Sequence, residues 1–317
     1  MRPSSTDRQR AQPHEQGHGE QVLRTTEFDA FGPWIYQVTT PDDIPRLFRS
    51  HPVDVAGALL ILKVPRNIER RDADPTMDLY DRLLVADDGG LTVLTRVEST
   101  FTVAALRWEE IAAVSTSVDL LDGRLTLLSA HAPLVIPFNG SSQESIIRLV
   151  ELVRSRYVAR ADTAPMPSPA PDTAVPAVET DLQNLHTRLL RTEPALRPVA
   201  AQQRASIRSA DPRPVVRALW NLWPTALQSA LYYADGRELV ILHRRSAIAR
   251  GFTPVHSIAR TAVALDRGTR IEVLDSPRFA AVRIVVVHLD ENRLELPFVA
   301  PSTAPELLTS MLTAQRS

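Results

Sequence analysis

The pentapeptide LVIPF at residues 134–138 recurs as LELPF at residues 294–298. After each copy, a Ser or Thr is followed three residues later by Glu, which is typical of a helix N-terminus: Ser141 with Glu144, and Thr303 with Glu306. Apolar residues at helical spacing then continue both patterns. A single Pro-Phe match carries little weight, but the same succession in both halves predicts a repeated unit that ends in an amphipathic helix.

Short apolar runs with turn residues between them precede each pentapeptide. The segment LLVADDGGLTVLTR, residues 83–96, is expected to turn at Asp87-Asp88-Gly89-Gly90. The segment ALYYADGRELVILHRR, residues 230–245, is expected to turn at Asp235-Gly236. Asp-Gly and Gly-Gly pairs between apolar runs are strong hairpin signals, because the turns that they form need positive φ. Each unit is therefore predicted to be an antiparallel sheet followed by one helix.

The two copies differ in length. Residues 255–265 are aligned with residues 107–117, and a further hairpin of the first copy is expected to turn at Asp122-Gly123. The offset in residue number between the two copies is larger at the pentapeptides (Leu134 and Leu294) than at the Ala-Asp pairs of the first hairpins (Ala86 and Ala234). This difference predicts a longer hairpin in the second copy, around residues 273–287.

Composition divides the chain into four segments. Residues 1–30 are polar and lack periodicity, which predicts a disordered tail, and residues 31–158 hold the first unit. Residues 159–214 begin with a Pro/Ala-rich stretch and are expected to be a linker, with a possible short helix formed by Leu182, Leu185 and Leu189. Residues 215–317 hold the second unit. Such a linker favours two units that move independently.

The predicted fold class is mainly β with some α: two barrels, each an antiparallel curved sheet capped by a C-terminal helix. On the hairpins at 87–90 and 235–236, the two pentapeptides and the helices that follow them, the chain resembles a tandem bacterial pleckstrin-homology-like protein. The resemblance implies binding modules that contact phospholipid headgroups, peptides or protein surfaces and that perform no catalysis. Fold alone does not choose among these ligands.

Charge and residue types exclude several functions. The formal net charge of −1 gives no global field that would attract nucleic acid, and the chain contains no Cys. No Gly-Lys-Ser/Thr, Gly-x-Ser-x-Gly or Gly-x-Gly-x-x-Gly motif occurs, so we expect no cofactor. Asp72, Asp74 and Asp78 lack the Gly and the terminal Glu of a calcium loop. A polar N-terminus without an apolar core and the absence of a long apolar run favour a cytoplasmic location.

Arg244, Arg245 and Arg250, beside His243, form the one compact basic cluster of the second unit. They are the candidate binding residues, for a phosphate or an acidic partner, although solvated arginines on a turn are the simpler interpretation. In the first unit, the loop at residues 65–77 mixes arginines with acidic residues, which departs from the lipid-binding pattern.

Two tryptophans complete the set of candidates. Trp220 and Trp223 share a helical face with Val216 and Leu219, and this face is expected to pack against the second unit, with a partner groove as the alternative. The predicted function is a non-catalytic scaffold that binds an unknown protein partner. Peripheral binding to an anionic membrane through the second unit is the alternative, and an enzyme of unrecognised type is a remote one.

Overall fold

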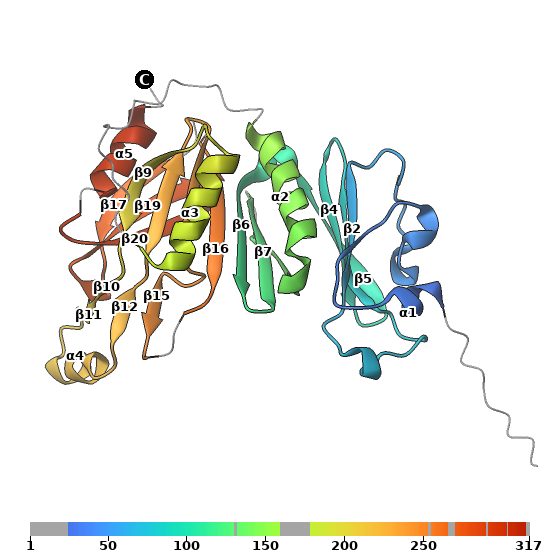
Figure 1. The fold of residues 1–317 in the computed structure, drawn as a ribbon, viewed down its shortest axis with the longest axis horizontal. Coiled ribbons are helices and arrows are strands. Elements are labelled where there is room, and N and C mark those ends of the chain that lie inside the picture. The colour runs from blue at the N-terminus through green and yellow to red at the C-terminus, as the bar shows by residue number, and fades with distance from the viewer. Residues whose placement is uncertain are drawn as a thin grey trace, which may run out of the picture.

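The computed structural model describes residues 25–129, 132–158, 178–252, 255–265, 270–289, 291–302 and 304–314. These residues form mainly antiparallel β-sheets with some helices (Figure 1). In this part of the chain none of the sheets closes into a barrel, so the expected barrels are replaced by pairs of separate sheets. The physical reason in the first unit is a short helical turn, η4 (Trp108–Glu110), which interrupts the chain between two strands and separates the sheets.

The first unit consists of one five-stranded and one three-stranded group of strands, followed by a helix. In chain order these are β1 (Tyr36–Gln37), β2 (Leu60–Pro65), β3 (Tyr80–Ala86), β4 (Gly90–Val97), β5 (Thr100–Arg107), β6 (Ile111–Asp119), β7 (Asp122–Ser129), β8 (Leu134–Asn139) and α2 (Gln143–Val158). The five-stranded sheet has the order β1-β2-β3-β4-β5, and β6, β7 and β8 pair as a meander. Short helical segments lie before and between these elements: α1 (Thr26–Ala30), η1 (Pro41–Asp43), η2 (Arg46–Phe48), η3 (Arg70–Asp72) and η5 (Gly140–Ser142).

The second unit repeats this plan. Its main elements are α3 (Thr180–Thr192), β9 (Arg197–Gln202), β13 (Ala230–Ala234), β14 (Glu238–His243), β16 (Ile258–Ala264), β17 (Arg270–Asp275), β19 (Val282–Leu289), β20 (Asn292–Val299) and α5 (Ala304–Ala314). Strands β9, β13, β14 and β16 pair as one group, and β17, β19 and β20 as another. Smaller elements extend from the unit: β10 (Ala205–Ser206), β11 (Arg208–Ser209), α4 (Pro214–Asn221), β12 (Thr225–Leu227), β15 (Ile248–Arg250) and β18 (Phe279–Ala280).

Two of the three predicted hairpin turns, those at residues 87–90 and 235–236, are confirmed and share one mechanism, whereas the turn predicted at Asp122-Gly123 lies at residues 120–121. Asp87 accepts hydrogen bonds through Oδ1 from the backbone N–H of Gly89 (2.8 Å) and Gly90 (3.0 Å). In the second copy, Asp235 accepts in the same way from Arg237 (2.9 Å) and Glu238 (3.0 Å). An Asp side chain that bonds the backbone two and three residues ahead stabilises the turn itself.

The helices after the pentapeptides are also confirmed, with one correction at the first of them. The side chain of Asn139, not that of Ser141, caps the helical turn η5 that leads into α2, because Asn139 Oδ1 accepts from Ser141 N (3.0 Å). The second predicted cap includes Thr303, which lies outside the described residues.

The extra length of the second copy lies elsewhere than predicted. Only residues 98–99 separate β4 from β5, whereas residues 244–257 stand between β14 and β16. Strand β16 still pairs directly with β14, just as β5 pairs with β4. Residues 255–265 therefore correspond to β5 and not to residues 107–117, and the expected insertion around residues 273–287 is wrong. The sequence alignment missed this because a strand can resume its pairing after an excursion of any length.

The two units are not independent, because one sheet runs through both. Strand β6 of the first unit pairs antiparallel with β16 of the second, from Ala113 opposite Val263 to Val118 opposite Ile258. The result is a seven-stranded sheet with the order β8-β7-β6-β16-β14-β13-β9, which occupies the middle of the molecule in Figure 1. The expectation of independent motion is therefore wrong.

The structure orders part of the predicted tail and most of the predicted linker. Residues 1–24 and 159–177 lie outside the described residues, but residues 26–30 form α1 and the segment from 180 to 214 is structured. The short helix predicted from Leu182, Leu185 and Leu189 is confirmed as α3, and β9 completes the edge of the seven-stranded sheet. Tertiary pairing orders a segment whose composition alone indicates a loop.

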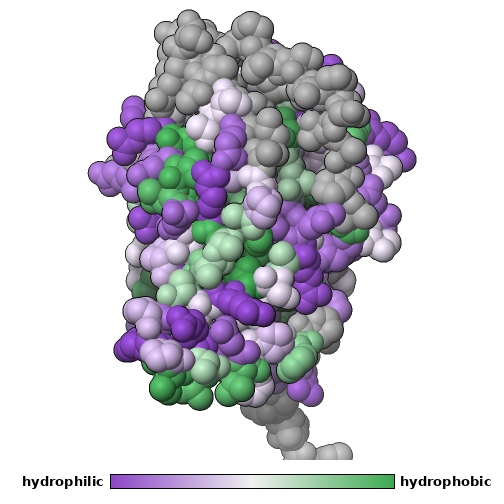
Figure 2. Space-filling view, turned by 90° about the vertical axis from the view of Figure 1, so that its left-hand side faces the viewer, coloured by the Kyte–Doolittle hydropathy of each residue, from purple (hydrophilic) through white to green (hydrophobic). Residues whose placement is uncertain are grey.

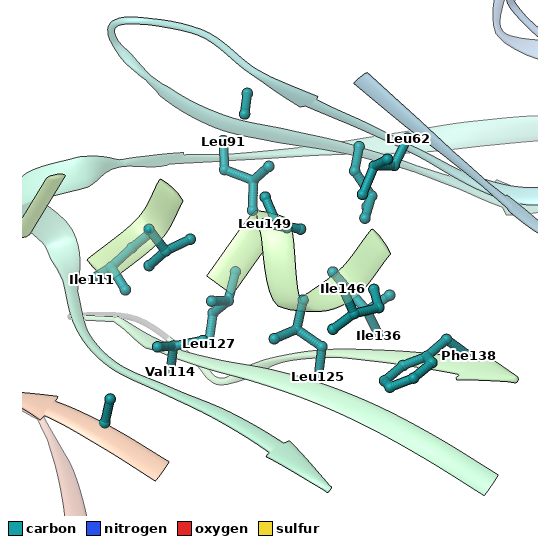
Figure 3. Close-up of a cluster of buried hydrophobic side chains, with 14 of the residues drawn as sticks. Leu62, Leu91, Ile111, Val114, Leu125, Leu127, Ile136, Phe138, Ile146 and Leu149 are labelled. Carbon is teal, nitrogen blue, oxygen red and sulfur yellow. The ribbon is translucent and has the colours of Figure 1, made fainter. Parts of the chain in front are cut away.

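The main core lies beneath α2, between the two sheets of the first unit. Figure 3 shows side chains of β6, β7 and β8 pointing toward Ile146 and Leu149 of α2, while Leu62 and Leu91 approach from the opposite sheet. The same cluster continues into the second unit through Leu242 of β14. Burial of these side chains therefore stabilises both units and the paired strands β6 and β16 that join them, which we call the β6–β16 seam.

Candidate functional site

Arg244, the first of the predicted binding residues, is buried and already paired. It follows β14, and its guanidinium donates two hydrogen bonds to the carboxylate of Asp181 in α3, at 2.6 and 2.9 Å. It also donates to the carbonyl oxygen of Ser257 at 3.1 Å. A bidentate Arg–carboxylate pair fixes orientation as well as charge. Arg244 thus attaches α3 to the second unit and offers no open anion site.

Arg245 points in another direction and joins the two units. Its Nε donates to Ser117 Oγ of β6 at 3.0 Å, and its other nitrogens donate to the carboxylate and the carbonyl oxygen of Asp122 in β7. Although these partners lie far away in sequence, the β6–β16 seam brings them next to the residues that follow β14. Arg245 therefore serves the interface between the units.

Arg250 is the one member of the predicted cluster that faces solvent. It lies at the end of β15, and its guanidinium stacks over the ring of Trp220 in α4 at 4.1 Å. The three arginines thus reach three different places, so they do not form a single binding surface. The sequence does not indicate this divergence, because it appears only once residues 244–250 leave the seven-stranded sheet after β14.

The pair of Asp181 and Arg244 gives stability that depends on pH. Burial acts to raise the pKa of Asp181, but the hydrogen bonds and charge of Arg244 outweigh it and hold that pKa below its usual 3.8. A carboxyl whose folded-state pKa is depressed contributes stability above its unfolded pKa and loses it as the pH falls through the folded value.

We therefore expect Asp181→Asn to lower the free energy of unfolding by about 1–2 kcal/mol near neutral pH, the lower end reflecting the partial exposure of Asp181. The difference from the unsubstituted protein should shrink as the pH falls below about 4. Urea unfolding at a series of pH values measures both quantities. A difference that stays constant down to about pH 3 would contradict the ion pair.

A groove of about 520 Å³ lies between α2 and α3, and four of the charged residues that line it pair with one another. Arg154 of α2 donates to Glu238 of β14 (Nε, 3.1 Å) and to Glu193 beyond α3 (2.5 Å), and Arg260 of β16 donates to both oxygens of Glu193 (2.7 and 2.8 Å). Burial alone would lower the pKa of Arg154, but its hydrogen bonds to these two carboxylates raise it. The network joins four elements across the seam, as a structural feature would.

The most unusual surface is the outer face of α4, which we call the α4 face. It is formed by Val215, Leu219, Leu222 and Trp223, all of which are exposed. Figure 2 shows hydrophobic atoms gathered at the lower end of this side of the molecule, where α4 lies in Figure 1. Phe252, which follows β15, is 82% exposed, and the hydrogen bond from Gly251 N to Pro224 O holds its segment beside the end of α4.

The tryptophan prediction is half confirmed. Trp220 and Val216 are partly buried on the inner side of α4, while Trp223 and Leu219 face solvent. An apolar residue in an exposed helix costs solubility, so a contiguous set of them marks an interaction surface in most soluble proteins. The sequence signal was available in the spacing of Val215, Leu219 and Leu222, but only the structure shows which side of the helix is covered.

Arginines border this face. Arg217 lies on α4 itself and is exposed, and Arg250 covers Trp220 from the neighbouring strand. Arg213, just before α4, is held by the carboxylate of Asp211 at 3.0 and 3.1 Å. The border of the α4 face is thus basic although the whole chain is slightly acidic.

Among the residues that the structure describes, no group of three or more His, Cys, Asp or Glu side chains is placed to hold a metal ion. In the acidic loop that resembles a calcium site, Asp74 accepts from Thr76 and Asp78 accepts from Arg46. No helix in the described ranges is long and apolar enough to cross a membrane.

Comparison of the chain with models of known protein families, with curated proteins and with solved structures finds no match in any of the three.

Proposed function

We propose that this chain is a non-catalytic interaction protein built from two pleckstrin-homology-like units. The order of elements supports the proposal, since each unit has a group of four antiparallel strands, to which β1 adds a fifth in the first unit, then three more in a second sheet, then a helix: α2 in the first unit and α5 in the second. Units of this kind contact their ligands through the loops and strand edges of a rigid sheet, which suits recognition better than catalysis.

The α4 face is the observation that carries the proposed function. Val215, Leu219 and Leu222 have the i, i+4, i+7 spacing with which an amphipathic helix inserts anchors into a hydrophobic groove. Trp223 adds an aromatic anchor, a residue type enriched among those that dominate binding energy. The partner is therefore a protein with an apolar groove, and the arginines around the α4 face call for acidic residues on the border of that groove.

An anionic membrane is the other surface that an apolar face with arginines around it can meet. The predicted membrane site at Arg244 and Arg245 is not supported, because both side chains are held in internal ion pairs. Arg217 and Arg250, beside Trp223 and Phe252, are the residues that such binding would use. We treat membrane binding as an alternative outcome of the test below.

A photo-crosslinking amino acid at Leu222 tests the proposal in the cells that make the protein. We expect a discrete protein adduct at this position and its loss when Leu219 and Trp223 are both changed to Ser. The same amino acid at Leu121, an exposed leucine of the first unit, is the control and should give no such adduct. Both positions are exposed, so neither substitution should disturb the core.

Co-sedimentation with vesicles of neutral and anionic lipids separates the two surfaces. Binding to anionic vesicles that weakens with salt and is lost in Leu219→Ser/Trp223→Ser would overturn the protein partner in favour of a membrane. If Leu222 forms no adduct and no vesicle is bound, the α4 face is not the binding site.

A further inference from the structure

The seam between the two units uses only half of the pairing edges that the repeat provides. It joins the outer strand of the three-stranded group of the first unit, β6, to the outer strand of the four-stranded group of the second unit, β16. Because the units repeat, each has both kinds of edge. The unused equivalents are β5 in the first unit and β17 in the second, and in the described residues each pairs on one side only.

The ladders of hydrogen-bonded strands give the equivalent positions without ambiguity. Leu91 of β4 lies opposite Leu106 of β5, and the matching Leu239 of β14 lies opposite Val263 of β16. Counting from these pairs places Ala105 at the position of Ala262. In the other sheets, Pro137 of β8 and Pro297 of β20 are the matching starting points. The strand pairs that lead from them through β7 and β19 make β17 the equivalent of β6.

Strand β5 is exposed where its counterpart is buried. Thr102, Val103, Ala104 and Ala105 are all exposed, whereas the equivalents of the last two, Thr261 and Ala262 in β16, are 3% and 1% exposed. The difference arises because β6 pairs with β16 and α2 packs on it, whereas in the described part of the chain β5 pairs with β4 alone and its other neighbour is η2, at Phe101. From Phe101 to Leu106, β5 therefore carries no charged side chain and is mostly apolar, and its outer edge is open.

Strand β17 shows the same contrast with β6. Ile271 and Val273 point into the core of the second unit but are only partly buried. Val114, the equivalent of Ile271, is 1% exposed because β16 lies beside it. The inner face of β17 is thus left open on the side where β6 has a neighbour.

The remaining long edges carry prolines, which block pairing because proline has no N–H to donate. Pro137 lies in β8, Pro198 in β9 and Pro297 in β20, and each of these strands is at the edge of its sheet. Natural sheets use proline and charge in this way to prevent edge-to-edge association. Among the described edge strands longer than three residues, β5 and β17 alone have no proline.

The backbone of both strands is oriented for pairing. Arg107 N donates to the side chain of Glu110 and not to β4, so the N–H groups of residues with its parity, Val103 included, face the open edge of β5. At the end of β17, Ser276 N donates to Val282 O and so points toward β19. N–H groups alternate in direction along a strand, and Val273 lies an odd number of residues before Ser276. The N–H of Val273 therefore points to the open edge of β17.

We propose that this chain assembles head to tail, with β17 of one copy paired to β5 of the next in the geometry of the β6–β16 seam. In the seam, Thr116 lies opposite Arg260 and Val114 lies opposite Ala262. If β17 and β5 pair in the same register, Val273 lies opposite Val103 and Ile271 lies opposite Ala105. Both new pairs are apolar, which stabilises adjacent strands. The contact is heterologous, so it gives rings where the rotation closes and open filaments where it does not.

This assembly uses surfaces other than the α4 face, so it stands or falls independently of the proposed function. Sedimentation velocity over a range of concentrations tests it. The unsubstituted protein should sediment with a mass that rises above the 35.1 kDa of one chain as its concentration increases. A constant mass of one chain up to about 1 mM would overturn the proposal.

Two proline variants identify the strands involved. Val103→Pro and Val273→Pro each remove one edge-facing N–H, a change that a folded edge strand tolerates. Each variant alone should remain a single chain, because one of its two edges is blocked. An equimolar mixture should form a dimer and stop there, since the intact β17 of the first variant pairs with the intact β5 of the second.

Val135→Pro is the matched control. Val135 is 45% exposed and Val103 is 47% exposed, and Val135 lies on the edge strand β8, with the same parity as Pro137. This variant should assemble like the unsubstituted protein, and circular dichroism should show all three variants folded. Assembly that survives both Val103→Pro and Val273→Pro, or that is lost in Val135→Pro, would show that other edges are used and would overturn the proposal.

Discussion

Arg154→Met is expected to lower the free energy of unfolding by about 3–5 kcal/mol, the range for removing one partner of a buried ion pair. Arg154 comes from the first unit, and both of its carboxylate partners lie in the second half of the chain. Glu238 is 3% exposed, so loss of the guanidinium leaves a buried carboxylate without its main counter-charge. The substitution therefore destabilises the seam and not only the helix that carries it.

Urea unfolding of Arg154→Met beside Arg156→Met measures this effect with a control from the same helix. Arg156 pairs with Asp88, whose side chain is largely exposed, and such pairs contribute about 0–1 kcal/mol. A similar small loss in both variants would mean that the Arg154 network does not hold the units together. Two separate unfolding transitions in Arg154→Met alone would instead confirm that the network couples them.

Ala262→Asp is expected to cost at least about 3 kcal/mol, because it places a carboxylate in the closed seam between β16 and β6. Ala262 is buried among apolar side chains that include Val114 and Val240, so a carboxylate there is removed from solvent. The carboxyl would either ionise at this cost or stay protonated with a raised pKa.

Ala105→Asp is the control, since Ala105 occupies the equivalent position on the open strand β5. It should change the free energy of unfolding by no more than about 0.5 kcal/mol, as substitutions at exposed positions do. Thermal unfolding at low protein concentration compares the two variants. Equal destabilisation by both would mean that β5 is covered in solution and that the two strands do not differ as the structure indicates.

Local chemistry decided how much of the fold could be predicted from the sequence. The turns at Asp87 and Asp235 were predictable because the aspartate side chain that stabilises each turn accepts hydrogen bonds from residues within the same turn. The turn between β6 and β7 was not: it lies at Leu120 and Leu121 and not at Asp122-Gly123. Leu120 adopts a φ of 55°, a conformation that its residue type disfavours and that the pairing of β6 with β7 imposes.

The candidate site was less predictable than the fold. Arg244, Arg245 and Arg250 lie within seven residues of one another in sequence, and a cluster of like charges indicates a binding patch. Their partners, Asp181 and Asp122, come from distant segments, and only the folded chain shows that two of the three charges are already neutralised. The exposure of the α4 face is likewise invisible in sequence, because a helical stripe of apolar residues normally indicates the buried side.

The sequence by itself determined the repeat, its hairpins, the two pentapeptides and the helices that follow them, because each of these depends on residues within a few positions of one another. The tertiary structure alone decided that the second copy inserts residues 244–257, that α3 and β9 order most of the expected linker, and that β6 pairs with β16. These features depend on which strand edges meet across long separations. Apart from proline, every residue presents the same backbone groups at an edge, so the partner of an edge is chosen mainly by the geometry of the whole chain.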